Sequence, residues 1–335
     1  MNETLTSPKQ SWSARFGHEV VRETHSADAE EHARGLRGWQ LSFDQLAAGR
    51  FRAHCLEFML DHMQLVHEHT NLSLGKAGQA IEGSVVFSLP LAADGEGACS
   101  GRRLGIPSVL LADGAALPEV RTPDALELVY IAIERGFLVE AAHCRGFDGL
   151  PKLLAGTSFL ELPLSKARLL SDRLRHLLEQ LQQARPYLHL QSLRQQVEQK
   201  VLDILLFTLY DAERVQMLAL DRSQKLVSRA RCVALETPAF PPGIDELCRR
   251  IGVSRRKLQN CFQQSLGLSP AQYLKTIRLN AVRRDLRKQP AARVGDIAAN
   301  WGFWHAGRFS AEYRELFGEL PSVTLTQHPG GFGKA

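Results

Sequence analysis

The last hundred residues repeat one local pattern, in which a short amphipathic helix, a glycine turn and a second helix follow one another. In the first copy, Gly252 follows a helix predicted over 244–251 and allows the sharp turn, and Ser254 is a good N-cap for a helix over 255–266. The buried faces of these two helices are expected to contain Ile244, Leu247, Cys248, Ile251, Leu258, Cys261, Phe262 and Leu266. The pattern predicts a compact all-helical domain at this end of the chain.

The second copy covers 294–301 and 305–317, with Gly302 at its turn. Between the copies, Ser269 and Pro270 begin a helix that runs to Lys288. A helix of this length spans roughly 27 Å, which approaches the roughly 34 Å of one DNA turn. The pattern therefore predicts two helix-turn-helix units that enter successive major grooves on one side of a duplex.

Charge and side-chain chemistry favour a nucleic-acid partner. Residues 223–335 contain 18 Lys and Arg against 8 Asp and Glu, whereas the rest of the chain contains 23 against 28. The outer face of helix 255–266 carries long polar side chains, of which Arg suits guanine, and Gln and Asn suit adenine. A protein that coats nucleic acid without sequence preference is the alternative, since a basic surface alone would serve that purpose.

Residues 223–326 resemble the DNA-binding domain of AraC/XylS-type regulators, on the stretches IDELCRRIGVSRRKLQNCFQQSLGLSPAQYLKTIRLNAVRRDL and IAANWGFWHAGRFSAEYRELFGELPS. The stretches RLNAVRRDL and WGFWHAGRFSAEYRELF are similar to the ethanolamine-operon regulator branch, as is, more loosely, RGWQLSFDQLAAGRFRAHCLEFMLDHMQLVHEHTNLSL. The resemblance implies a bacterial transcription activator that binds promoter DNA as a homodimer and contacts RNA polymerase.

The resemblance also implies which side chains meet DNA. Positions Arg256, Gln259 and Asn260 would read bases, whereas the second unit has Ala306 and Gly307 where the family often has polar side chains. We therefore expect the second unit mainly to hold phosphates. The predicted DNA contacts are Arg255, Arg256, Gln259, Asn260, Gln263, Lys275, Arg284, His305, Arg308 and Arg314.

The rest of the chain predicts an α+β multidomain protein. We expect a loose tail over 1–35, a β-rich domain over 36–160, a helical region over 161–222, the DNA-binding domain over 223–326 and a flexible tail over 327–335. Short apolar runs split by turns predict a small barrel or sandwich, and the family resemblance implies a cupin-like β-barrel that senses a small molecule. Leu170, Leu174, Leu177 and Leu181 form a stripe for dimerisation, with packing against the β-domain as the alternative.

The effector is less constrained than the fold. The residues predicted to line its site are Trp39, Arg52, His54, Glu57 and Tyr130. The branch resemblance implies ethanolamine, with a cobalamin as a second choice. An equally open reading is a regulator of a virulence or quorum-sensing programme with a divergent or absent ligand.

A metal-dependent cupin enzyme fused to a DNA-binding module is the remaining alternative. His67 and His69 would share one face of a strand, and His54 and His62 are near in sequence. No carboxylate and further histidine can be placed beside them from the sequence, so no metal and no cofactor are predicted. The chain has no G-x-S-x-G, P-loop or dinucleotide motif, which favours a non-enzyme. The absence of any long apolar run predicts a cytoplasmic protein.

Overall fold

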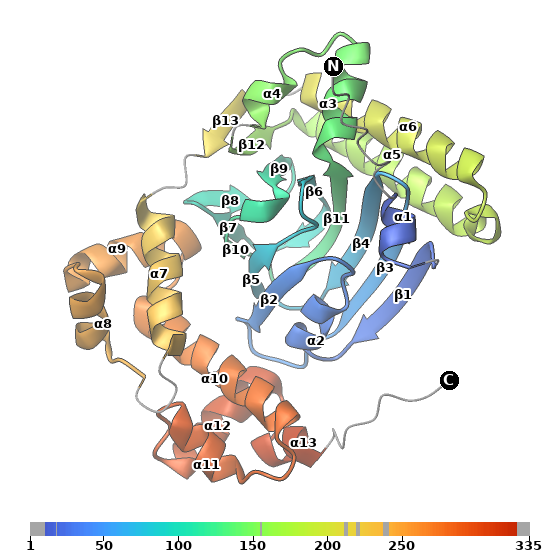
Figure 1. Ribbon diagram of the computed structural model, residues 1–335. Coiled ribbons are helices and arrows are strands. Elements are labelled where there is room, and N and C mark those ends of the chain that lie inside the picture. The colour runs from blue at the N-terminus through green and yellow to red at the C-terminus, as the bar shows by residue number, and fades with distance from the viewer. Residues whose placement is uncertain are drawn as a thin grey trace, which may run out of the picture.

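The computed structural model describes residues 11–17, 19–154, 156–210, 214–218, 222–236 and 241–326. The protein is a mixed α+β molecule, with a sheet domain in its amino-terminal part and a helical domain at its carboxy-terminal end (Figure 1). The predicted tail over 327–335 lies outside the described residues. No helix in the described ranges is long and apolar enough to cross a membrane.

The sheet domain contains two sheets. The larger sheet has the strand order β1-β3-β4-β11-β6-β9-β12-β13 and the smaller one the order β2-β5-β10-β7-β8. The strands of the larger sheet are β1 (Val21–Ser26), β3 (Ala53–Met59), β4 (Met63–Thr70), β6 (Ser84–Asp94), β9 (Ser108–Asp113), β11 (Ala125–Glu134), β12 (Thr157–Glu161) and β13 (Arg214–Leu218). Those of the smaller sheet are β2 (Gln40–Gln45), β5 (Leu74–Gln79), β7 (Gly97–Cys99), β8 (Arg102–Leu104) and β10 (Val120–Arg121).

The sheets are open, so the prediction of a closed barrel is wrong. Among the described strands, β1 pairs only with β3 and β2 only with β5, and no strand belongs to both sheets. The inner faces meet in an apolar layer that includes Met59, Val66, Val86 and Tyr130. The cupin-like character of the domain stays a prediction.

Residues 11–35 are more ordered than the sequence predicts. They contain α1 (Trp12–Arg15), β1 and α2 (Ala29–Arg34). Asp28 caps α2 by accepting hydrogen bonds from the backbone amides of Glu30 and Glu31 at 3.1 and 3.0 Å, and β1 completes the sheet edge. The prediction of a loose tail is wrong for this stretch because its polar residues make interactions with distant parts of the chain, which local composition cannot reveal.

Helices cover the outer face of the larger sheet. Figure 1 shows α5 and α6 crossing one side of it. The helices that follow the central strands are α3 (Arg135–Cys144), α4 (Leu150–Leu153), α5 (Leu164–Gln183) and α6 (Gln191–Tyr210), with short 3₁₀ turns at Gly114–Ala116 and Arg185–Tyr187. The predicted 161–222 region is therefore helical up to residue 210, but 214–218 adds strand β13 beside β12.

The leucine stripe of α5 packs inside the chain. Leu170, Leu174, Leu177 and Leu181 are all buried in one apolar cluster with sheet residues such as Val129 and Ile131. The prediction that these leucines form a dimer seam is wrong in this arrangement, because the outer face of the sheet already occupies them. The alternative weighed from the sequence, packing against the β-domain, is what the structure has.

The carboxy-terminal domain consists of helices alone in its described residues. They are α7 (Arg222–Glu236), α8 (Ile244–Ile251), α9 (Arg255–Leu266), α10 (Pro270–Lys288), α11 (Val294–Asn300), α12 (Ala306–Phe317) and α13 (Pro321–Thr326). The boundaries of α8, α9 and α10 agree with the predicted ones. Glycine and N-cap signals in the sequence set these ends.

Candidate nucleic-acid interface

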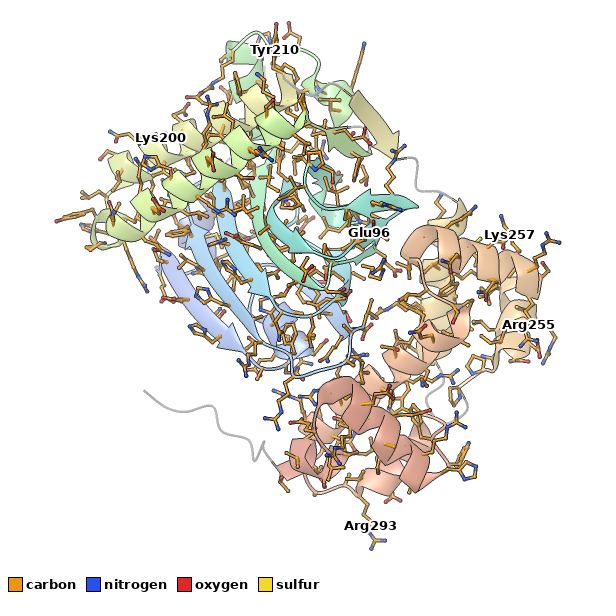
Figure 2. All side chains as sticks on the ribbon, turned by 180° about the vertical axis from the view of Figure 1, so that it is seen from behind. Glu96, Lys200, Tyr210, Arg255, Lys257 and Arg293 are labelled. Atoms are coloured by element: carbon orange, nitrogen blue, oxygen red, sulfur yellow. The ribbon has the colours of Figure 1, made fainter. Side chains whose placement is uncertain are left out.

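Helices α8 and α9, which we call the first reader, have the geometry of a helix-turn-helix unit. Gly252 ends α8 with φ +76°, a left-handed conformation that glycine adopts without strain. The Ser254 hydroxyl caps α9 by accepting a hydrogen bond from the amide of Lys257 at 3.2 Å. The apolar face of α9 is buried, whereas Arg255, Arg256, Gln259, Asn260 and Gln263 are all exposed. Figure 2 shows Arg255 and Lys257 projecting from α9 away from the sheet domain.

The second reader, α11 with α12, repeats this arrangement. Gly302 has φ +82°, and a Cβ there would lie 2.5 Å from the Cγ of Pro241, so only glycine fits the turn. His305, Arg308 and Arg314 are exposed. Trp304 is 67% exposed beside them. The sequence analysis did not select Trp304 for this surface, although an aromatic residue just before a reader helix is a signal for it.

Helix α10 joins the two readers rigidly. Its first half contributes Tyr273, Leu274 and Ile277 to the core of α7, α8 and α9. Its second half contributes Leu279, Val282 and Leu286 to the core of α11 and α12. Lys275 contacts Glu312 at 3.4 Å and so links α10 to α12 at the surface, and Arg308 of α12 contacts the same carboxylate at 3.1 Å. Because one unbroken helix belongs to both cores, the readers cannot turn independently without disrupting one of them.

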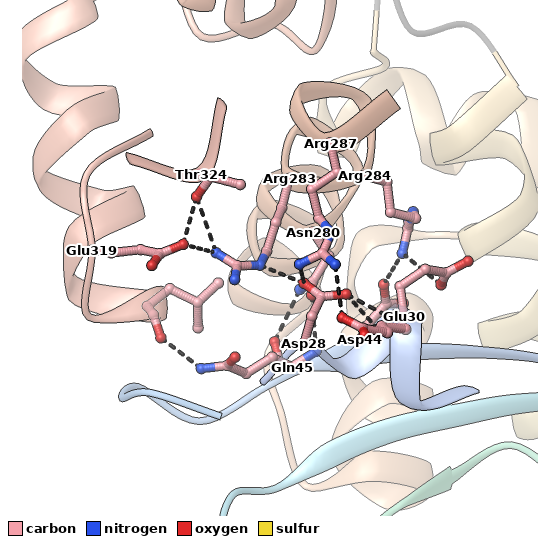
Figure 3. A network of polar contacts seen from close by, with 12 residues as sticks. Asp28, Glu30, Asp44, Gln45, Asn280, Arg283, Arg284, Arg287, Glu319 and Thr324 are labelled. Carbon is pink, nitrogen blue, oxygen red and sulfur yellow. Dashed lines mark hydrogen bonds and ion pairs between the residues drawn. The ribbon is translucent and has the colours of Figure 1, made fainter. Parts of the chain in front are cut away.

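Arg284 does not lie on the exposed reader surface. Its guanidinium donates to Asp44 at 2.8 Å and lies 3.8 Å from Glu30, both in the sheet domain. It belongs to a network, shown in part in Figure 3, that we call the interdomain clamp. The clamp consists of Asp28, Glu30, Glu31 and Asp44 of the sheet domain and Arg231, Arg283, Arg284 and Arg287 of the helical domain. In this arrangement the Arg284 side chain pairs with carboxylates of the protein. It is therefore not available for the predicted contact with a DNA phosphate.

Two acids of the clamp, Asp44 and Asp28, are held ionised. Burial alone would raise the pKa of Asp44, but the guanidinium groups of Arg231 and Arg284 outweigh burial and lower it below its ordinary value. The pKa of Asp28 is lowered in the same way, against burial, by Arg283 and Arg287. The Arg283 guanidinium bridges two carboxylates: it donates to Asp28 at 2.6 Å and to Glu319, just beyond α12, at 2.7 Å.

The sheet domain also donates hydrogen bonds to backbone carbonyls of both readers. Arg121 donates to the carbonyl of Leu266, at the end of α9, at 2.6 Å. At the other reader, the carbonyl of Leu316 accepts from the Gln45 side chain at 2.7 Å and from the Gly49 amide at 2.9 Å. The sheet domain therefore touches the carboxy-terminal end of each reader helix and leaves the exposed faces of both clear.

The sheet domain also contains two small adjacent hollows lined mainly by apolar side chains, which together we call the cavity. Each has a volume of about 50 Å³, and they share Ser88, Leu110, Val120 and Tyr130 in their linings. Of the predicted effector residues, Trp39 and Tyr130 line the first hollow. Sequence analysis missed Lys76, whose signal is the one charged residue of strand β5.

The remaining predicted effector residues lie elsewhere. His54 is on the outer face of the sheet, where it contacts Glu23 at 2.9 Å. Glu57 is buried in an ion pair with Arg37 at 3.0 Å. Arg52 is exposed in the loop before β3. None of these three belongs to the linings of the two hollows.

Comparison with known proteins identifies the carboxy-terminal domain. A family model described as a helix-turn-helix domain matches residues 247–327. The probable thc operon regulatory protein of Rhodococcus erythropolis is 46% identical over 91 residues, which is 27% of each chain. The XylDLEGF operon transcriptional activator of Pseudomonas putida is 39% identical over 87 residues, 25% of this chain and 27% of that one.

A solved transcriptional regulator of Chromobacterium violaceum, titled as containing an AraC-type DNA-binding domain, is 32% identical. The match covers 32% of this chain and 97% of that one, with a TM-score of 0.30. The carboxy-terminal domain is similar to the helix-turn-helix domains of bacterial operon regulators. The chain spans about a quarter of the length of these two curated relatives, so the similarity concerns the helical domain alone.

Proposed function

We propose that this protein is a sequence-specific, DNA-binding transcription activator of bacterial genes. The observation that carries the proposal is the pair of reader helices, each with an exposed polar face, fixed on one unbroken α10. The curated relatives of the helical domain are named as operon regulators and activators, which supports the same role. The family resemblance also supports a homodimer and a contact with RNA polymerase. Sedimentation equilibrium with and without promoter DNA tests for the homodimer. A pull-down of RNA polymerase tests for the polymerase contact.

Base reading by α9 is tested by Gln259→Ala. The amide of an exposed glutamine on a reader helix can make two hydrogen bonds to adenine, so its loss is expected to cost about 1–3 kcal/mol at a specific site. The protein's sites are first found by genome-wide mapping, and affinities are then measured on the strongest site and on random DNA at about 0.15 M salt.

The matched control is Gln196→Ala, which removes the same side chain from an exposed position of α6. It should leave both affinities unchanged. If Gln259→Ala lost the same affinity for the specific and the random duplex, this residue would contact only the DNA backbone and not the bases. A uniform footprint of the unaltered protein would favour the coating alternative instead.

The cavity supports a mainly apolar effector. Its first hollow is lined mainly by apolar groups such as Trp39, Leu41 and Phe43, and the Lys76 ammonium in the lining is already paired with Glu68. The lining offers no carboxylate of its own to an ammonium group, so ethanolamine, which the sequence resemblance implies, fits it poorly. Thermal unfolding with ethanolamine and with small apolar compounds separates the two: only a ligand that binds the folded protein raises its melting temperature, and a rise with ethanolamine would contradict this assignment.

Strand β2 connects the cavity to the clamp. Successive side chains of a strand point to opposite faces, and here Leu41 and Phe43 line the hollow while Ser42 and Asp44 accept hydrogen bonds from Arg231 at 3.2 and 2.5 Å. A molecule that displaces Phe43 therefore also moves the backbone that carries Asp44. We infer that effector binding changes the fit between the sheet domain and the readers by this route.

A further inference from the structure

The outer face of the larger sheet carries a row of imidazole and carboxylate groups away from both the cavity and the readers. His25 lies opposite His54, His54 opposite His69, and His69 opposite Glu127, across the four neighbouring strands β1, β3, β4 and β11. Directly opposed side chains in antiparallel strands have Cβ atoms about 4.5–5.5 Å apart. The strand register therefore gathers groups that are distant in sequence.

His67 lies on the same face of β4 as His69 and forms a compact group with His69 and Glu127. Nε2 of His67 lies 3.1 Å from Oε1 of Glu127, and the two imidazole rings have centroids 4.4 Å apart at an interplanar angle of 65°. One nitrogen or oxygen of each residue lies within 4.8 Å of the others. An ion bound at about 2.0–2.2 Å from each ligand atom needs only small side-chain rotations to reach all three.

The carboxylate that the sequence analysis could not place is therefore Glu127, brought in by strand pairing. Glu68, between the two histidines, points the other way and is buried against Lys76 and His32. The His67 and His69 side chains thus lie on the opposite side of the sheet from the cavity. This position does not favour a metal-dependent enzyme whose centre lies between the sheets.

One feature of the surroundings suits metal binding. Arg175 of α5 donates to Oε2 of Glu127 at 2.9 Å and leaves Oε1 directed at His67. Ligands of metal sites are commonly oriented by such outer hydrogen bonds.

We propose that His67, His69 and Glu127 form a binding site for a divalent first-row transition-metal ion of the kind that imidazole prefers, such as Zn²⁺. Two imidazoles and one carboxylate supply three ligands, and the partly exposed position leaves further coordination to water. The site is separate from the DNA surface, so the proposal does not depend on the function proposed above.

The test is a calorimetric titration of Zn²⁺ into the full-length protein after treatment with a chelator. The expected result is one saturable site whose affinity falls at least about tenfold in a His67→Ala, His69→Ala double variant. The matched control, His143→Ala with His176→Ala, removes two exposed histidines elsewhere and should leave the affinity unchanged.

Glu127→Gln provides a second variant, because it keeps the side-chain shape and removes only the charge. It should weaken Zn²⁺ binding by a similar factor while the melting temperature of the metal-free protein changes little. The proposal is overturned if the unaltered protein has no saturable site, or if the histidine double variant and Glu127→Gln both bind Zn²⁺ as tightly as the control.

Discussion

Replacing Asp44 by alanine is expected to lower the free energy of unfolding by about 3–5 kcal/mol, because it leaves two largely buried guanidinium groups without their shared carboxylate. The Asp44 side chain is 2% exposed, and Arg231 and Arg284 are 15% and 16% exposed. The penalty is that of an uncompensated buried charge, and it is larger than the contribution of the ion pairs themselves. Urea unfolding measures the loss, and small-angle scattering measures whether the helical domain moves away from the sheet domain.

The matched control is Glu31→Ala. Glu31 also pairs with a clamp arginine, Arg287, at 2.8 Å, but it is 52% exposed. An exposed pair of this kind contributes at most about 1 kcal/mol. A loss below about 1 kcal/mol for Asp44→Ala as well would show that the domains are held together by contacts other than the clamp.

The same variant has a defined acid behaviour. Because the folded-state pKa of Asp44 is lowered from 3.8, its contribution is fully present above that value and is lost as the pH falls through the lower, folded-state pKa. The unaltered protein should therefore lose stability more steeply than Asp44→Ala below about pH 4.

The sequence predicted the helical domain well because local signals decide it. Gly252, Ser254, Ser269 and Pro270 each fix a helix end through backbone geometry or capping, and both cores follow helical periodicity. Some of the strands follow from a related signal, because β3, β4, β6, β9 and β11 coincide with short apolar runs between turns in the predicted β-rich domain. Such features need no knowledge of the rest of the chain.

The clamp could not be predicted because it is made by long-range pairing. Arg284 lies on a basic helix beside Arg283 and Arg287, a pattern that serves a phosphate backbone and an acidic protein surface equally well. Its partners, Asp44 and Glu30, are 240 and 254 residues away in sequence. The same reason applies to Glu127, which only the β4 to β11 register brings to the two histidines.

The second large effect is expected at the buried cluster beside the cavity. Glu68 accepts from the Lys76 ammonium and contacts Nε2 of His32 at 2.7 Å, and Lys76 also donates to the Tyr130 hydroxyl at 2.8 Å. Although burial would raise the pKa of Glu68, Lys76 and His32 lower it to about 2. The carboxylate therefore stays ionised, and its contribution to stability is present at neutral pH and is lost only as the pH falls from about 4.5 toward 2.

Glu68→Leu and Lys76→Met are each expected to cost about 3–5 kcal/mol, since each leaves the other charge buried without its main partner. The double variant removes both charges and replaces them by apolar groups of similar size, so its cost should fall below the sum of the single costs by about 0.5–3 kcal/mol. Urea unfolding of the four proteins at pH 7 gives this coupling. Single costs that simply add would mean that Glu68 does not neutralise Lys76, and the ammonium would then be free to bind an anionic group of an effector in the cavity.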